Sequence, residues 1–286
     1  MVDNRETNVP AGVAVICQGL VFIYRVDGYD VVALSRVDLD VAPGEAVALV
    51  GPSGSGKSTL LSLMAGLLRP SAGKLRVGEH DLVRAGQREL QRMRANEIGV
   101  VLQGDRNIVD YLSTTDNIRF AQRGAAGGRR ADPRELLDLV GLPGRSAARA
   151  YPPDLSPGQR QRLSVAVAIS VGGGLLLADE PTSQLDAEAR ESVIEALLAV
   201  NHTGTTVVVV THDADIAHRF GRTVTIRDGR VGAEGRRGED FLVVGADGAV
   251  HLPPEFLARI APGSLLRAQW SETGAVMLVP AETERT

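Results

Sequence analysis

The stretch that decides the fold is Gly51-Pro52-Ser53-Gly54-Ser55-Gly56-Lys57-Ser58. It follows an apolar run at residues 46–50 and precedes a stripe of leucines with helical spacing. This is the strand–loop–helix context that a G-x-x-x-x-G-K-[ST] motif requires. Glycines let backbone N–H groups face a chain of phosphates, and the following helix N-terminus adds partial positive charge. The motif therefore predicts a phosphate-binding loop in which Lys57 reaches the outer phosphates and Ser58 ligates Mg²⁺.

The composition agrees with an ordinary globular nucleotide enzyme. The chain has 286 residues, of which 44% are hydrophobic, enough for one large domain with or without a small appendage. Its single cysteine, Cys17, excludes an internal disulfide framework and suits a reducing compartment. A net charge of −4 gives no support for nonspecific nucleic-acid binding. We see no signal peptide, and no apolar run with the roughly 18 residues that a membrane-spanning helix needs.

Strand-like and helix-like patterns alternate along the chain. β-branched residues fill positions 205–210, and the apolar runs at 100–102 and 175–178 also have the character of buried parallel strands. Helical patterns lie between them, at 134–140, 159–170 and 187–200. This alternation predicts an α/β fold.

A change of composition near residues 235–238 divides the chain. We expect an N-terminal tail at 1–11, a main domain at 12–235 and a small C-terminal domain at 236–286.

Two adjacent carboxylates, Asp179 and Glu180, follow the apolar run at 175–178. In open α/β sheets, ligands bind at the carboxyl ends of the strands. Successive side chains on a strand point to opposite faces, so the two acids should differ in task. We predict that one holds the Mg²⁺ shell and that the other orients or deprotonates the attacking water.

With these elements in place, the chain resembles the ATP-binding subunits of ABC transporters, with motifs in the family's order from about residue 12 to residue 235. Leu155-Ser156-Pro157-Gly158-Gln159 is similar to the family signature, 178–182 to its Walker B segment and 183–186 to its D-loop. Thr211-His212-Asp213 matches the switch histidine, and Gln103 matches the Q-loop. Tyr24, 27 residues before Gly51, is placed like the aromatic residue that stacks on adenine, with Tyr29 as the nearby alternative.

The resemblance implies a P-loop NTPase of ABC type, with a RecA-like core, a β subdomain and a helical signature subdomain, plus a small mostly-β C-terminal extension. It implies an ATPase that uses ATP and Mg²⁺, with Glu180 and His212 as the catalytic residues. The metal ligands would be Ser58, Gln103 and Asp179. The residues expected to bind the nucleotide are Tyr24, Gly51, Pro52, Ser53, Gly54, Ser55, Gly56, Lys57, Ser58, Thr59, Gln103, Ser156, Gly158, Gln159 and Asp179.

The implied function is to power a separate integral-membrane permease, with two copies of the chain forming a head-to-tail dimer. Such a subunit would be cytoplasmic and bound to the inner face of the cell membrane through its permease. The polar segment 104–112 is the expected docking region. The chain is similar to the lipoprotein-release, macrolide-export and cell-division group, whose members act in export or transmit mechanical force.

Pro157 departs from the family pattern, which normally has glycine at this position. Proline removes a backbone N–H and fixes φ. If that N–H contacts phosphate in other members, we expect slower but not absent hydrolysis, since Ser156, Gly158 and the helix N-terminus remain as donors.

The C-terminal segment resembles an AbrB-type swapped-hairpin domain. It reads as a hairpin turning at Asp247-Gly248, a helix begun by proline, and two strands at 265–270 and 275–279. The basic residues of such domains are replaced by Ala249 and Pro254, and residues 236–286 hold five arginines against seven acids. We therefore expect dimerisation or simple packing on the ATPase, and no nucleic-acid partner. The alternative function is a soluble regulatory or nucleic-acid-associated ABC ATPase that uses this domain for partner or DNA contact.

Overall fold

The computed structural model describes residues 12–104, 107–124, 131–236, 239–245, 248–252, 254–261, 263–271 and 273–280. The expected N-terminal tail at 1–11 lies outside these residues. Within the described chain no helix is long and apolar enough to cross a membrane.

A mixed sheet forms the centre of the molecule, with its described strands in the order β11-β10-β9-β3-β8-β7-β6. The parallel strands are β3 (Ala46–Val50), β6 (Ile98–Val101), β7 (Leu175–Asp179), β8 (Thr206–Val210) and β9 (Arg222–Arg227). Every residue of β8 is buried, as the β-branched run predicted for a strand covered on both faces.

A smaller antiparallel sheet covers one face of the central sheet. Its order is β2-β1-β4-β5, with β1 at Val15–Val26, β2 at Tyr29–Val41, β4 at Ala72–Val77 and β5 at His80–Asp81. Helix α1 (Lys57–Met64) contacts strands of both sheets, because its buried side chains reach in both directions. Helix α2 (Gln87–Asn96) leads from this layer into β6.

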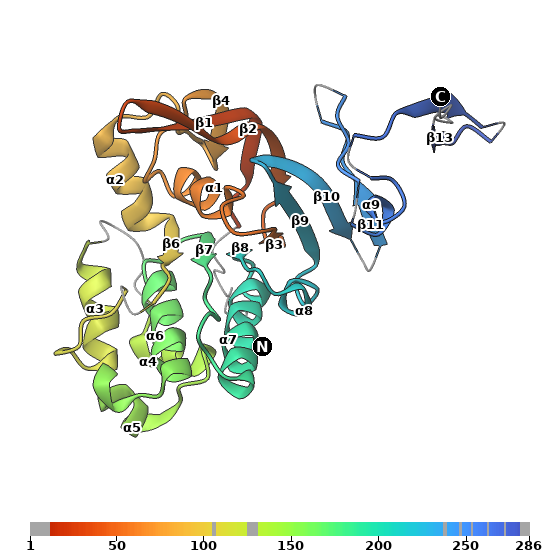
Figure 1. Ribbon diagram of the computed structural model, residues 1–286. Coiled ribbons are helices and arrows are strands. Elements are labelled where there is room, and N and C mark those ends of the chain that lie inside the picture. Colours follow the sequence, from red (N-terminus) through yellow and green to blue (C-terminus); the bar gives the residue numbers. More distant parts are fainter. Residues whose placement is uncertain are drawn as a thin grey trace, which may run out of the picture.

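Helices cover the opposite face of the central sheet (Figure 1). They are α3 (Thr114–Gly124), α4 (Pro133–Leu139), α5 (Gly144–Arg149), the short 3₁₀ helix η1 (Pro152–Asp154), α6 (Pro157–Ile169), α7 (Ala187–His202) and α8 (Ala214–Ala217). The alternation along β3 serves both cores: Val47 and Leu49 belong to the core around α1, and Ala46 and Ala48 to the helical core. This arrangement confirms the α/β architecture with a β subdomain and a helical subdomain.

The C-terminal segment is joined to the main domain by strand pairing. β10 spans Arg230–Arg236, so the boundary expected after residue 235 falls inside a strand. β11 (Glu239–Leu242) pairs antiparallel with β10 and extends the central sheet. The amino-acid composition changes at this point, but the hydrogen bonds between β10 and β11 continue across it.

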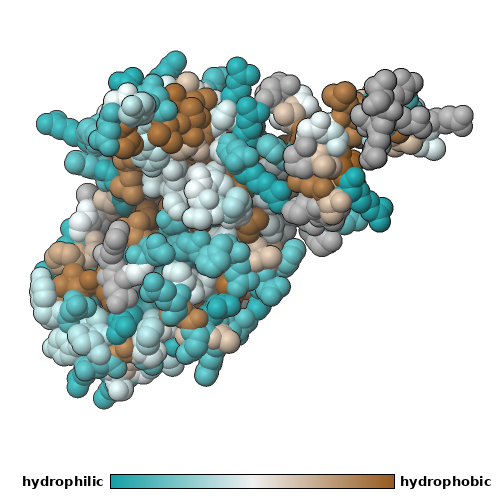
Figure 2. Space-filling view, viewed as in Figure 1, coloured by the Kyte–Doolittle hydropathy of each residue, from teal (hydrophilic) through white to brown (hydrophobic). Residues whose placement is uncertain are grey.

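The tail beyond β11 contains one isolated bridge, Val244 to Val250, then helix α9 (Pro254–Leu257) and the hairpin of β12 (Leu266–Trp270) and β13 (Val276–Pro280). Asp247, at the expected first turn, lies outside the described residues. The β12–β13 hairpin projects away from the main domain, and exposed apolar side chains gather on the tail (Figures 1 and 2).

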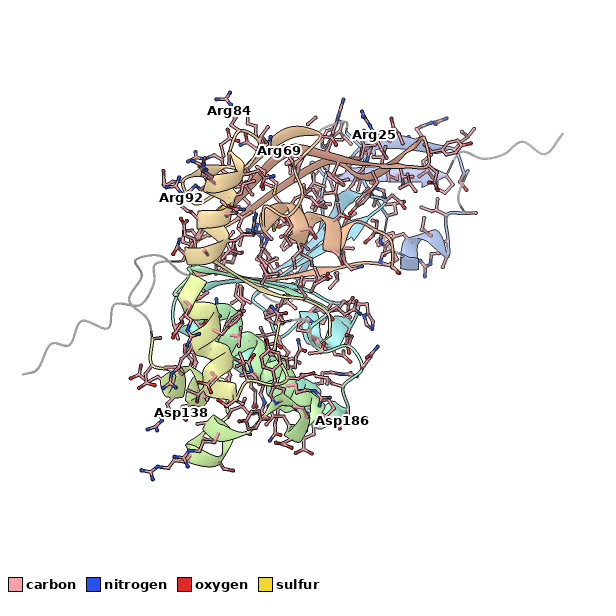
Figure 3. The ribbon with its side chains drawn as sticks, turned by 90° about the vertical axis from the view of Figure 1, so that its left-hand side faces the viewer. Arg25, Arg69, Arg84, Arg92, Asp138 and Asp186 are labelled. Carbon is pink, nitrogen blue, oxygen red and sulfur yellow. The ribbon has the colours of Figure 1, made fainter. Side chains whose placement is uncertain are left out.

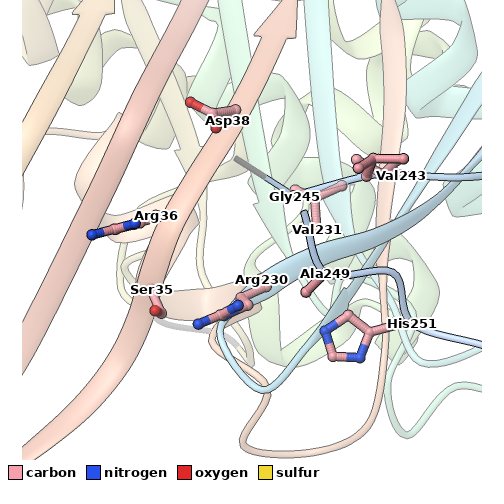
Figure 4. A pocket seen from close by; sticks show the side chains of 10 residues that line it. Ser35, Arg36, Asp38, Arg230, Val231, Val243, Gly245, Ala249 and His251 are labelled. Atoms are coloured by element: carbon pink, nitrogen blue, oxygen red, sulfur yellow. The ribbon is translucent and has the colours of Figure 1, made fainter. Parts of the chain in front are cut away.

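The base of the tail packs against β2 and β10 (Figure 4). The Val243 N–H donates to the Gly232 carbonyl, and a Cβ added at Gly232 would lie 3.3 Å from the Cβ of His251. A cavity of about 50 Å³ remains between Ser35 and Arg36 on one side and the tail on the other. The tail is therefore anchored to the main domain at its base.

Candidate nucleotide-binding site

The phosphate loop connects β3 to α1 at the carboxyl end of the parallel strands. Gly51 has φ 143°, and a Cβ there would lie 2.0 Å from the Ile226 carbonyl oxygen. Gly56 has φ 101°, and its Cβ would lie 2.5 Å from the Ala33 carbonyl oxygen. Neither position can hold a side chain, because the loop is pressed against β9 on one side and β2 on the other.

Lys57 is buried at the start of α1, where its Nζ donates to the carbonyls of Gly51 (2.9 Å) and Pro52 (2.8 Å). Burial lowers the pKa of Lys57, against the opposing effect of the Glu180 and Asp179 carboxylates. The ammonium therefore lies across the loop, beside the position that phosphates would occupy in a loop of this kind.

Ser58 and Asp179 form a pair of oxygen ligands beside the loop. The Ser58 Oγ donates to Asp179 Oδ1 at 2.9 Å. Burial raises the pKa of Asp179, with Ser58 and Lys57 acting in the opposite direction. The Ser58 hydroxyl and the Asp179 carboxylate are hard oxygen donors. These two residues fit Mg²⁺, which is commonly held by one or two protein groups together with substrate phosphates.

Glu180 and His212 meet across neighbouring strands. Glu180 follows β7 and His212 follows β8, and His212 Nδ1 lies 2.7 Å from Glu180 Oε2. The Glu180 side chain is 18% exposed, whereas that of His212 is 70% exposed. Glu180 also has φ 49°, a left-handed conformation that side chains other than glycine rarely adopt. The Glu180 carboxylate contacts His212, whereas that of Asp179 contacts Ser58.

A cleft of about 540 Å³ brings most of the predicted residues together. Those that line it are Tyr24, Ser53, Gly54, Gly56, Lys57, Ser58, Thr59, Gln103, Glu180 and His212. The rings of Tyr24 and Phe22 form a T-shaped pair, and the Tyr24 hydroxyl lies 3.3 Å from the Thr59 Oγ1. Tyr29, the alternative for stacking, is at the exposed turn between β1 and β2 and does not line the cleft.

Some residues of this region were not predicted from the sequence. Val31, Val32 and Ala33 line the cleft from β2 without having been predicted, whereas Ser183, which also lines it, belongs to the segment that resembles the D-loop. Asn107 bonds the Leu102 N–H (2.8 Å) and the Val100 carbonyl (2.6 Å), and so fixes the start of the loop that follows Gln103. An isolated valine or asparagine carries no motif, so only the fold reveals these contacts.

Comparison with known proteins identifies the family. A family model described as "ABC transporter" matches residues 34–183, more than half of the chain. The chain belongs to the ABC transporter family. Its ATP-binding domain is that of an ATPase, as the family and the site geometry both indicate.

The relatives of this ABC ATPase include larger proteins. This chain is 41% identical over 206 residues to the macrolide export ATP-binding/permease protein MacB of Burkholderia thailandensis. The match covers 71% of this chain and 31% of that protein. The chain therefore spans about a third of the length of such relatives. An ABC transporter ATP-binding protein of Thermotoga maritima is 39% identical over 219 residues, covering 76% of this chain and 92% of that one.

Among solved structures, the dimeric post-hydrolysis state of the ATP-binding cassette MJ0796 bound to ADP and Pi superimposes with a TM-score of 0.69. The two sequences are 30% identical, and the match covers 78% of this chain and 98% of that cassette. These relatives agree with the resemblance to the macrolide-export group.

The ABC signature lies at the N-terminus of α6 and does not line the cleft. Ser156 caps the helix: its Oγ accepts from the Gln159 N–H, and Gln159 Oε1 accepts from the Ser156 N–H. Pro157 occupies the first helical position, where an N–H has no partner within a helix. The Gly158 N–H has no hydrogen-bond partner in the described part of the chain, and Gly158 itself is buried.

Proposed function

We propose that this ABC ATPase powers a separate membrane permease of export or mechanotransmission type, acting as a head-to-tail dimer. One observation carries the proposal. The phosphate loop, Glu180 and His212 share one cleft, and Asp179 is joined to it through Ser58, while Ser156 and Gly158 lie outside it with donors still unused. Two copies in opposite orientation would bring the signature of each to the nucleotide of the other. The dimeric state of the related cassette MJ0796 supports this arrangement.

In the proposed cycle the adenine rests against Tyr24 and the phosphates follow the loop. Lys57 exchanges its bonds with the Gly51 and Pro52 carbonyls for bonds with outer phosphate oxygens. Ser58 and Asp179, with Gln103 at the cleft wall, would hold Mg²⁺, which when bound neutralises charge on the phosphates.

Glu180 is proposed to accept the proton of the attacking water, since its carboxylate faces the cleft at the carboxyl end of β7. His212 is its hydrogen-bonded neighbour at 2.7 Å and orients that carboxylate and the water. The exposure of His212 leaves it free to reach a γ-phosphate as a donor. Ser156 and Gly158 of a second copy would complete the phosphate shell from the opposite side.

The permease is proposed to dock on the segment that follows Gln103. Residues 105 and 106 lie outside the described chain, but the rest of this segment is well held. The buried Asn117 side chain accepts from the Val109 N–H and donates to the carbonyls of Val109, Leu112 and Ser113. Tyr111, between these anchors, is 82% exposed. A fixed loop that presents an exposed aromatic side chain suits a protein partner. This would place the ATPase in the cytoplasm, on the inner face of the membrane.

The test is the Glu180→Gln variant. It should bind ATP normally, hydrolyse it at a small fraction of the normal rate, and accumulate as a dimer in ATP and Mg²⁺. Size-exclusion chromatography with light scattering, at saturating ATP, measures the dimer, and the same sample in ADP is the control. Co-purification of the tagged chain with a membrane protein, at native expression, tests the permease.

A Glu180→Gln protein that stays monomeric in ATP, both alone and with its co-purifying partner, would exclude the composite site if the unaltered chain hydrolyses ATP. Lys57→Ala is the matched control, because it should abolish ATP binding and dimer together.

A further inference from the structure

The first turn of α7 contacts two functional segments at once. It begins directly after Asp186, whose carboxylate caps the helix by accepting from the Ala189 N–H at 2.8 Å. In Figure 3, Asp186 lies in the helical layer, across the central sheet from Arg25 and Arg69. One residue of this turn, Ala189, packs against the signature helix, and the next, Arg190, reaches toward the switch segment 211–213.

The contact with the signature helix leaves no free space. A Cβ placed on Gly158 would lie 2.7 Å from the Ala189 Cβ and 3.2 Å from its Cα. The two backbones therefore approach each other closely at the N-terminus of α6. Close-packed elements move together, since neither can shift toward the other without overlap. A movement of the signature toward α7 must displace Ala189 and, with it, Arg190.

Arg190 binds the residue next to the switch histidine. Its Nη1 donates to Asp213 Oδ2 at 3.0 Å, while its buried Nε has no partner in the described chain. The other oxygen of Asp213 caps α8 by accepting the backbone N–H groups of Asp215 and Ile216. On the opposite side of His212, the buried Thr211 donates its N–H to the Leu49 carbonyl in β3. His212 is thus held between β3 on one side and Arg190 on the other.

We propose that Arg190 is a positioning residue that fixes the switch histidine and couples it to the signature helix through the first turn of α7. The proposal rests on the proposed roles of His212 and of the signature in the composite site. Arg190 would act on hydrolysis through Asp213 and His212, without touching nucleotide. Loss of its guanidinium leaves Asp213 as the cap of α8 but frees the segment that presents His212.

The chain offers a matched control, an ion pair whose acidic partner lies on the same helix. Arg219, just after α8, bonds Glu191 of α7 through its Nη1. The two arginines are similarly exposed, 44% for Arg219 and 41% for Arg190, while Glu191 is 47% exposed and Asp213 25%. The pair of Arg219 and Glu191 joins the same two regions of the chain, yet no hydrogen bond or ion pair joins its side chains to residues 211–213 in the described chain. Arg219→Gln therefore removes a similar ion pair and leaves the switch segment untouched.

The experiment compares steady-state ATP hydrolysis of the full chain with that of Arg190→Gln, Arg219→Gln and His212→Ala. We expect Arg190→Gln to lower kcat about tenfold, about 1.4 kcal/mol in the activation barrier, with KM for ATP changed less than about twofold. Arg219→Gln should keep normal kcat and KM. Asp213→Asn is measured as well. The double variant Arg190→Gln/Asp213→Asn should be no slower than the slower of its two single variants, because the two substitutions break the same contact. Thermal unfolding of each variant reports any loss of folded protein.

Equal kcat in Arg190→Gln and Arg219→Gln would overturn the coupling. So would a loss of kcat that matches the loss of folded protein, since that is a structural effect. His212→Ala separates this failure from that of the proposed function. If His212→Ala stops hydrolysis while Arg190→Gln does not slow it, only the inference fails. If His212→Ala hydrolyses ATP at the normal rate, the role of the histidine fails and the inference with it.

Discussion

Replacing Gly158 with alanine adds a methyl group where α6 and α7 are closest. The new Cβ would lie 2.7 Å from the Ala189 Cβ, whereas carbon atoms in contact are about 3.5–4.0 Å apart. The helices must therefore separate by about 1 Å at this point. Overpacking of this kind costs about 1–3 kcal/mol, and the better helix propensity of alanine offsets at most about 1 kcal/mol of it.

The expected net loss of unfolding free energy is thus between zero and about 3 kcal/mol, or a fall in Tm of up to about 12 °C for a chain of this size. The effect on turnover should be larger, about 100-fold, because a displacement of about 1 Å misplaces the Gly158 N–H that we propose as a phosphate donor. ATP affinity should not change, since Gly158 does not line the cleft of its own chain. Calorimetry, steady-state hydrolysis and titration with a fluorescent ATP analogue measure the three quantities.

The second substitution Ala189→Gly removes the atom that the new methyl group would strike. Gly158→Ala/Ala189→Gly should therefore recover most of the lost turnover, while Ala189→Gly alone should have little effect on rate. Normal turnover of Gly158→Ala would refute the importance of the contact. A double variant as slow as Gly158→Ala would show that overlap with Ala189 is not the cause.

Three further predictions follow from other parts of the chain. Pro157→Gly restores an N–H at the start of α6 and should raise turnover about tenfold if that N–H meets phosphate; an unchanged rate would mean that the Gly158 N–H and the Ser156 hydroxyl suffice. His80 lies with Nδ1 3.0 Å from Glu89 and Nε2 2.9 Å from Glu97, and its hydrogen bond with Glu89 raises its pKa, with Glu97 adding in the same direction and burial opposing. Because the native state then holds the proton more tightly than the unfolded state, the Tm advantage over His80→Gln should be complete below about pH 6.5 and lost as pH rises through the raised pKa; a difference that does not vary with pH would contradict this. If the tail holds two copies of the chain together without nucleotide, removing residues 258–286 should abolish these dimers and make turnover depend steeply on protein concentration. A full-length chain that is monomeric without ATP would leave the tail as a packed appendage. DNA binding by the full chain that is lost on this truncation would contradict the charge argument.

The sequence predicted those parts of the site whose chemistry is local. The phosphate loop needs glycine at positions that its neighbours close, such as Gly51 and Gly56, and these constraints appear as a motif. The adjacent acids Asp179 and Glu180 have different partners, Ser58 and His212. The left-handed backbone of Glu180, however, was not predicted, because no residue pattern indicates it.

Contacts between distant segments could not be predicted in the same way. Arg190 and Asp213 are 23 residues apart, and each is an ordinary charged residue within its own segment. Only the order of strands, with β8 between β3 and β7, brings the segment after β8 beside the start of α7. The boundary after residue 235 shows the same limit, since composition changes there while the ladder of β10 and β11 continues.

The base of the tail lies close to the support of the phosphate loop. Ser35, at the edge of the cavity beneath the tail, donates its N–H to the Gly229 carbonyl at 2.8 Å. Gly229 in turn donates to the Ser55 carbonyl, in the phosphate loop itself, at 3.1 Å. Two backbone hydrogen bonds therefore connect the tail's docking surface to the loop. A truncation that removed β11 would disturb this support and mix effects on nucleotide binding with effects on association. Removing residues 258–286 leaves the anchored base in place. A change in how the turnover of the truncated protein depends on protein concentration therefore reports on the removed segment, which contains the hairpin.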